Sequence, residues 1–214
     1  MGRSRKRSDD RLSEAAMLLE DGDYSGALAA LDESLKLDPM SADIWYRRGL
    51  ALCALERYEE AIECFGRVLD LEPDDMAAWY NWGIALDNLN RSEEAIECYD
   101  RALELDPGEA DVWGSRGLAL CALERYEEAI ECLDQAIELE PDNAATWTNK
   151  GAALDSLGHH EEALQCLDRA LELEPDDMAA WHNKGVTLNN LGRPEESALC
   201  YDRALELHAI WRYR

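Results

Sequence analysis

The sequence has no long apolar run and few basic residues. No segment approaches the roughly 18 consecutive apolar residues of a membrane-spanning helix, and no apolar stretch follows the basic N-terminus as in a signal peptide. The 21 basic residues are outnumbered by 47 acidic ones, and the formal net charge of -26 repels nucleic-acid backbones and anionic lipid surfaces. We therefore expect a soluble, cytoplasmic protein that binds neither nucleic acid nor membranes.

The sequence also lacks the motifs of catalysis. It contains no glycine-rich phosphate loop and no serine or cysteine nucleophile motif. His159 and His160 are adjacent, but neighbouring side chains on a helix diverge by about 100°, and no cluster of carboxylates or cysteines accompanies them. The sequence therefore predicts a protein that is not an enzyme and has no catalytic residue, no metal and no cofactor.

The cysteines do not suggest a disulfide framework either. There are seven, an odd number, and five of them share a spacing of 34 residues: Cys64, Cys98, Cys132, Cys166 and Cys200. Equivalent positions of stacked repeats point in parallel, about one repeat apart, which suits neither a disulfide nor a metal cluster. We expect these thiols to be small, half-buried side chains in a reducing cytosol.

What the sequence does contain is a repeat. Residues 48–64 (RGLALCALERYEEAIEC) recur letter for letter at 116–132, and looser copies reveal a period of 34 residues. A unit of this size does not bury its own apolar face and must stack on its neighbours. We expect a disordered basic arm at 1–7, a tail at 212–214 and a single array over 8–211 made of six units: 8–41, 42–75, 76–109, 110–143, 144–177 and 178–211.

Each unit has the pattern of two helices. With positions numbered 1 to 34 within a unit, Trp at position 4, Gly at position 8 and Leu at position 11 form one helical stripe. The glycine marks a place where another helix approaches closely. A second stripe occupies positions 20, 24, 27 and 28, and Pro at position 32 ends the second helix. Turns around Gly22, Gly158 and Gly192 then predict antiparallel helix pairs.

This pattern of aromatic, Leu, Gly, Tyr, Ala, aromatic, Ala and Pro over 34 residues resembles the tetratricopeptide repeat family across residues 8–211. Units such as WHNKGVTLNNLGRPEESALCYDRALEL are most similar to prokaryotic and archaeal members. The resemblance implies an all-α fold, a right-handed α-solenoid of six helix-turn-helix repeats. It also implies a non-catalytic scaffold or adaptor that binds an extended segment of a protein partner in a concave groove.

In the family, the exposed face of the first helix lines that groove. Here positions 5, 6 and 9 are mostly uncharged and partly apolar. An asparagine at position 6 donates to one peptide carbonyl and accepts from the neighbouring N–H, as in the asparagine ladder of superhelical members; a merely solvated asparagine is the alternative. The carboxylate clamp for acidic chaperone tails is absent. The candidate peptide-binding residues are Tyr46, Arg47, Leu50, Tyr80, Asn81, Ile84, Leu118, Asn149, His182 and Asn183.

Two departures from the family pattern suggest further interpretations. Position 7 is basic in four units, and these side chains are expected to cover the core and reach the glutamates of the second helices. At the C-terminus Ala209 replaces the proline, and residues 209–214 resemble an abortive seventh repeat that leaves Leu199, Leu205 and Ile210 open. The alternative function is therefore a structural protein that forms a homo-oligomer through its uncapped C-terminal helix, or a fragment of a longer repeat protein.

Overall fold

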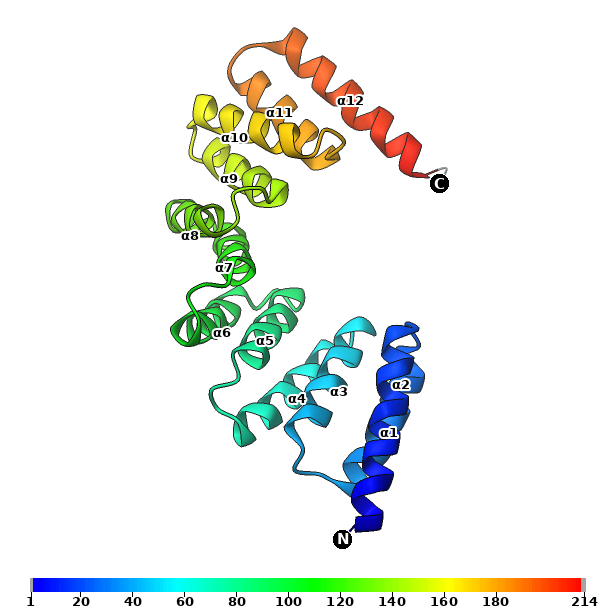
Figure 1. The fold of residues 1–214 in the computed structure, drawn as a ribbon. Helices are drawn as coiled ribbons and strands as arrows, with labels where there is room; N and C mark the ends of the chain where they lie inside the picture. Colours follow the sequence, from blue (N-terminus) through cyan, green and yellow to red (C-terminus); the bar gives the residue numbers. More distant parts are fainter. Residues whose placement is uncertain (1, 213–214) are drawn as a thin grey trace. The chain divides into compact units, whose positions relative to one another are not determined.

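The computed structural model describes the backbone of residues 2–212 and the side chains of residues 11–210 and 212. Within residues 2–212 there are twelve α-helices and no strand, as the all-α prediction requires (Figure 1). The helices fall into two compact units, Met1–Pro107 and Gly108–Arg214, and each is described by itself.

The first unit contains three helix pairs. Consecutive helices run antiparallel and pack side by side, and each second helix also packs on the first helix of the next pair (Figure 1). The six helices are α1 (Gly2–Glu20), α2 (Tyr24–Leu37), α3 (Ala42–Ala54), α4 (Tyr58–Leu71), α5 (Met76–Asn88) and α6 (Ser92–Leu105).

The second unit repeats this arrangement with three further pairs. Its helices are α7 (Ala110–Ala122), α8 (Tyr126–Leu139), α9 (Ala144–Ser156), α10 (His160–Leu173), α11 (Met178–Asn190) and α12 (Pro194–Arg212).

Both ends of the chain differ from the sequence-based expectation. Helix α1 begins at Gly2, so residues 2–7, expected to form a disordered arm, lie in its first turns. The reason is local, since the arginines and lysine of this stretch are good helix formers and no proline interrupts it. At the other end, residues 209–212 continue α12 and do not start a seventh repeat, because Ala209 lacks the ring that ends the earlier second helices. Residues 213 and 214 of the predicted tail lie outside the described residues.

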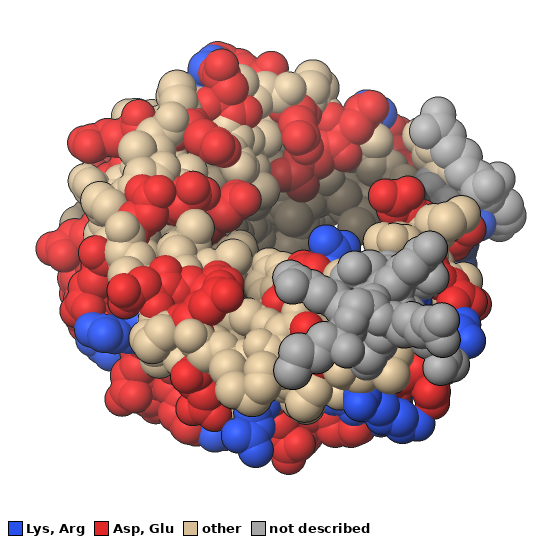
Figure 2. All heavy atoms as spheres, turned by 60° about the horizontal axis from the view of Figure 1, so that its bottom comes forward, with Lys and Arg blue, Asp and Glu red and all other residues tan. Residues whose placement is uncertain are grey.

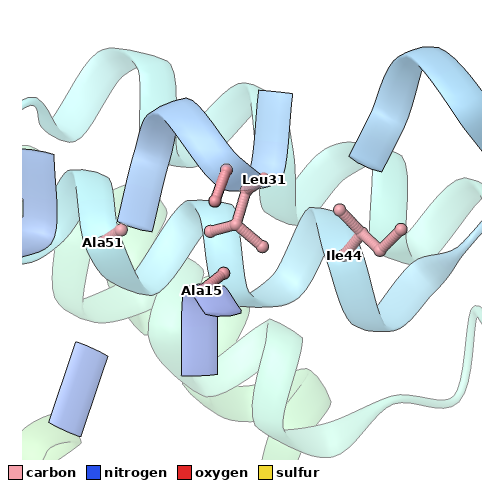
Figure 3. Packing of buried hydrophobic residues seen from close by; sticks show 5 residues of the cluster. Ala15, Leu31, Ile44 and Ala51 are labelled. Carbon is pink, nitrogen blue, oxygen red and sulfur yellow. The ribbon is translucent and has the colours of Figure 1, made fainter. Parts of the chain in front are cut away.

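Buried side chains of three consecutive helices form the core at the N-terminal end. Ala15 of α1, Leu31 of α2, and Ile44 and Ala51 of α3 converge in one cluster (Figure 3). Leu31 is fully buried at position 24, and Ala15 stands at position 8, where the later repeats have glycine. The first repeat therefore completes its core with side chains from the second.

The glycine at position 8 allows the two helices of a pair to come close. A Cβ atom on Gly49 would lie 2.6 Å from Cε1 of Phe65, and one on Gly151 would lie 2.8 Å from Cγ of Leu167. Since real Cβ contacts are longer than this, only glycine fits. The predicted close approach is confirmed.

The turn inside each pair passes through the left-handed region at position 15. Three repeats use glycine there, such as Gly22 with φ of 76°, but Glu56 and Glu124 adopt the same conformation at 58° and 59°. The following amide then bonds back into the first helix, as Arg57 N does to Leu52 O at 2.9 Å. The turn thus recurs even where its usual residue is missing.

Between pairs, the tryptophan at position 4 fastens the turn that precedes its helix. The indole N–H of Trp45 donates to the carbonyl of Pro39 at 2.9 Å, and that of Trp181 donates to the carbonyl of Pro175 at 2.8 Å. Trp79 and Trp147 make the same bond. The proline at position 32 and the tryptophan six residues later therefore act together to fix the turn between two helix pairs.

Candidate peptide-binding surface

In the first unit, the predicted groove residues lie on neighbouring helices. Tyr46, Arg47 and Leu50 stand on α3, and Tyr80, Asn81 and Ile84 stand on α5; all six are partly exposed. The Asn81 side-chain amide donates to the Tyr46 hydroxyl at 3.1 Å, across the two helices. The structure therefore brings these two predicted residues into direct contact.

This contact limits what Asn81 can do. Its amide nitrogen donates to Tyr46 and also to the backbone carbonyl of Ala77 at 2.8 Å, which engages both of its N–H donors. The amide oxygen is left as the group that accepts a bond from a peptide. A full rung of an asparagine ladder at Asn81 would require the Tyr46 or Ala77 bond to break.

The second unit presents its asparagines differently. Asn149 on α9 and Asn183 on α11 are partly exposed, and no described residue hydrogen-bonds to either amide. The two helices pack against each other, so the amides occupy equivalent places on adjacent repeats. Leu118 on α7 is 47% exposed and provides apolar surface in the same unit. The side-chain amides of Asn149 and Asn183 therefore keep their N–H donors and their carbonyl acceptors available for a ligand.

His182 and Asn183 belong to a separate hollow at the C-terminal end. The hollow has a volume of about 640 Å³ and lies between α11 and α12. Its other lining residues are almost entirely apolar: Met178, Ala179, Tyr201, Ala204 and Leu205, with His208 at the edge. Sequence reasoning had placed the two residues in one continuous groove and missed this hollow, which lies beside α12, the last helix of the described residues.

Position 5 is held in place by the second helix of the same repeat. The Tyr46 ring meets Phe65 edge-on at 6.0 Å, and the His182 ring lies 5.5 Å from that of Tyr201. At Thr148 the hydroxyl instead donates to the Asp177 carboxylate at 3.0 Å. The second helix of the same repeat thus packs against the aromatic side chains at this position, which remain at least partly exposed.

The charged residues of the chain are predominantly acidic. Acidic side chains dominate the face drawn in Figure 2, and basic ones are few. Arg47, the basic candidate residue, is paired on its own helix with Asp43 at 2.8 Å. An acidic surround of an uncharged surface favours a partner segment that is neutral or basic.

Asp87 is a half-buried acid that sequence reasoning did not single out. It stands at position 12 of α5, where its carboxylate accepts a hydrogen bond from the Tyr99 hydroxyl at 2.7 Å. Burial raises the pKa of Asp87, with the hydrogen bonds from Tyr99 and Ser92 opposing the shift. The sequence signal was an acid where two other repeats carry cysteine, at Cys53 and Cys121.

We expect Asp87→Asn to change how stability depends on pH. The folded-state pKa of Asp87 lies above its unfolded value, so its contribution to stability is fully present below the unfolded pKa and is lost as pH rises through the folded pKa. As the pH rises from below the unfolded-state pKa of about 3.9 through the raised folded-state pKa, the wild type should therefore lose stability relative to the variant. Urea unfolding at several pH values measures this difference, with Asp74→Asn as the control for net charge. A difference that stays constant with pH would contradict it.

The cysteines and His160, the other residue types capable of catalysis or metal binding, are accounted for by burial or by contacts with other side chains. All seven cysteines lie in the described part of the chain as free thiols, and the five with the 34-residue spacing are buried. Burial raises the pKa of Cys53 to about 11 and that of Cys98 to about 12, so both are protonated at neutral pH. His160 contacts the Asp155 carboxylate through Nδ1 at 2.8 Å.

The described residues contain neither a metal-binding cluster nor a membrane-spanning helix. Among the described side chains, no group of three or more His, Cys, Asp or Glu is arranged to hold a metal ion. Within residues 2–212, every helix is too short or too polar to cross a membrane.

Comparisons with solved structures agree with the fold. The structure of YrrB, described as a tetratricopeptide repeat protein with an unusual peptide-binding site, is 28% identical, with a TM-score of 0.71 over 81% of this chain and 90% of that one. A MamA structure is 24% identical, with a TM-score of 0.74 over 82% of this chain and 94% of that one. MamA from Desulfovibrio magneticus RS-1 is 21% identical, with a TM-score of 0.74, and the match covers 78% of this chain and 95% of the MamA chain. At these identities the MamA matches show the fold alone.

Sequence comparisons identify the repeat type. The uncharacterized protein MJ0572 of Methanocaldococcus jannaschii is 46% identical over 46 residues, which make up 22% of this chain and 54% of that protein. The chain thus spans about half the length of this relative. Four models described as tetratricopeptide repeat match residues 13–65 and 48–110, 83–146, 120–184 and 179–208. Since matches to one repeat type run from residue 13 to residue 208 and helix pairs recur throughout, the chain belongs to the tetratricopeptide repeat family.

Proposed function

We propose that this chain is a non-catalytic scaffold that binds an extended segment of a partner protein on the exposed faces of its first helices. The observation that carries the proposal is the pair Asn149 and Asn183, whose amides lie on adjacent helices with no bond to another described residue. Such a pair suits the backbone of an extended peptide, because each amide offers a donor and an acceptor. YrrB, the 28% identical neighbour described as having a peptide-binding site, supports the same class of function.

In the first unit the proposed contacts are mainly apolar. Tyr46, Tyr80, Leu50 and Ile84 supply partly exposed ring and aliphatic surface, and the Asn81 oxygen supplies one acceptor. Aromatic side chains already fixed by neighbouring rings lose little entropy when a partner binds. We therefore propose that this unit contributes affinity and that the asparagine pair of the second unit sets the position of the peptide backbone.

The test compares two double variants. Asn149→Ala with Asn183→Ala removes the amide pair, whereas Gln135→Ala with Gln165→Ala removes two exposed amides from the second helices α8 and α10. Proteins retained from a lysate of the source organism are identified by mass spectrometry, and the affinity of a retained segment is then measured. We expect the asparagine variant to bind at least about tenfold more weakly, since each lost hydrogen bond is worth roughly 1 kcal/mol. Equal affinity of both variants would refute the asparagine contacts.

The setting of the proposed scaffold is the cytoplasm. The seven free thiols support a reducing compartment, because exposed and buried cysteines of exported proteins are commonly oxidised to disulfides.

A second candidate function is self-association through α12. Leu205 is 66% exposed, whereas Leu69 and Leu103 at the same position of earlier repeats are each 8% exposed. For Leu69 the difference arises because α5 packs against it, whereas no helix follows α12 in the described part of the chain. A second copy of the chain seated on Leu205 would remove this apolar surface from water.

Light scattering over a range of concentrations distinguishes this candidate. Leu205→Glu should convert an oligomer to a monomer, and Met40→Glu, which alters an exposed side chain elsewhere, should not. A wild-type protein that stays monomeric at the highest concentration would remove the candidate.

A further inference from the structure

Most repeat junctions share an ion pair that is not part of the peptide-binding surface. The basic residue at position 7 bonds to an aspartate at position 25 of the preceding repeat: Arg48 to Asp32 at 2.8 Å, Lys184 to Asp168 at 2.6 Å, and Lys150 to Asp134. The expected partners were glutamates of the second helices. The structure instead pairs each of these cations with an aspartate of the second helix.

The same cations lie over tryptophan rings. The guanidinium carbon of Arg48 is 5.9 Å from the ring centre of Trp45, and Nζ of Lys184 is 5.4 Å from that of Trp181. Lys150 stands over Trp147 at 5.9 Å. Each of these junctions therefore shows how the fold binds a cation, between an indole face and a carboxylate.

The junction between α4 and α5 breaks this rule at both positions. Position 25 is Gly66 and position 7 is Trp82, so the aspartate and the cation are both missing. Trp82 stacks on Trp79 at 5.7 Å with the ring planes 5° apart. A Cβ atom on Gly66 would still lie 3.8 Å from Trp82, so the glycine leaves room beside the indole.

A hollow of about 520 Å³ opens at this junction. Its floor is made by Gly66, Trp79 and Trp82, and its rim carries Glu63, Arg67 and Asp70. Arg67 and Asp70 pair with each other at 3.3 Å, which leaves the exposed Glu63 carboxylate as the excess charge of the rim. No lysine or arginine among the described residues lies over Trp82, whereas Arg101 lies 6.0 Å over Trp79.

We propose that this hollow binds an arginine side chain of a partner protein. The Trp82 ring itself lies over Trp79, where the other junctions have the chain's own cation, so the arginine places its guanidinium on the indole face of Trp82 and its charge toward Glu63. A planar guanidinium suits a flat ring and a carboxylate better than an ammonium does. The formal net charge of -26 favours the approach of a basic segment. None of the candidate peptide-binding residues lines this hollow, so the proposal stands independently of that surface.

A double variant tests the proposal without changing the net charge. Gly66→Asp with Trp82→Arg recreates the Asp32 and Arg48 pair of the junction between α2 and α3 and closes the hollow. The probe is a nine-residue peptide with three arginines spaced by glycine and serine, and its matched control carries citrulline in place of arginine. Binding is measured by tryptophan fluorescence at physiological salt. We expect the double variant to bind the arginine peptide at least about tenfold more weakly than the wild type.

A milder pair of variants keeps the test valid if the double variant fails to fold. Glu63→Gln removes the excess rim charge, and Glu131→Gln makes the same change at the same position of α8. We expect about threefold weaker binding for Glu63→Gln alone. Equal affinity of these two variants, equal affinity of the double variant and the wild type, or equal binding of the citrulline peptide would each overturn the proposal.

Discussion

Replacing Phe65 by alanine lowers the free energy of unfolding by about 3–5 kcal/mol. Phe65 is fully buried and packs with Leu28, Leu52, Ala61 and Cys64, so it joins side chains of three helices. The loss has two parts, the apolar surface returned to water on unfolding and the cavity left in the folded state. Urea unfolding followed by circular dichroism measures the effect.

Phe65→Leu is the matched control for this prediction. Leu133 and Leu167 occupy the same position in later repeats, each fully buried against a glycine at position 8. Since leucine is compatible with the site and removes less volume, we expect a loss of about 1 kcal/mol. If alanine and leucine lowered the stability equally, the cavity argument would be wrong.

Gly83→Ala is expected to lower the free energy of unfolding by about 1–3 kcal/mol through overpacking. Its Cβ atom would lie 2.4 Å from Cε1 of Tyr99. The Tyr99 ring does not withdraw easily, because it is buried to 1% exposure and its hydroxyl is bonded to Asp87 at 2.7 Å. The clash thus outweighs the gain of about 1 kcal/mol that alanine normally brings to a helix.

Gly114→Ala is the same substitution at another helical glycine, and we expect it to stabilise the protein. Gly114 lies inside α7, and a Cβ atom there would meet nothing within 4 Å. We expect this variant to have a free energy of unfolding about 1 kcal/mol higher than the wild type, because alanine restricts the unfolded chain and causes no clash in the folded one. The same urea titration measures both variants, and a stabilised Gly83→Ala would show that the two helices separate to admit the methyl group.

Sequence periodicity and tertiary structure give different information about the candidate site. Periodicity placed Tyr46 and Asn81 on exposed helix faces, which depends only on the helical repeat. It did not reveal that Asn81 donates to Tyr46, 35 residues earlier in the chain. It also treated Asn81, Asn149 and Asn183 as equal rungs, although the structure leaves only the amides of Asn149 and Asn183 with all their hydrogen-bonding groups available.

The sequence by itself determined the period, the helix pairs and the family, because these depend on local patterns: the Trp, Gly and Leu stripe and the helix-ending proline. Only the tertiary structure decided which side chains meet across helices. It showed that position 7 pairs with aspartate, that Gly66 lies beside Trp82, and that the half-buried Asp87 accepts a hydrogen bond from Tyr99. These features depend on the distance and angle between neighbouring repeats, and a pattern read along one helix contains no information about them.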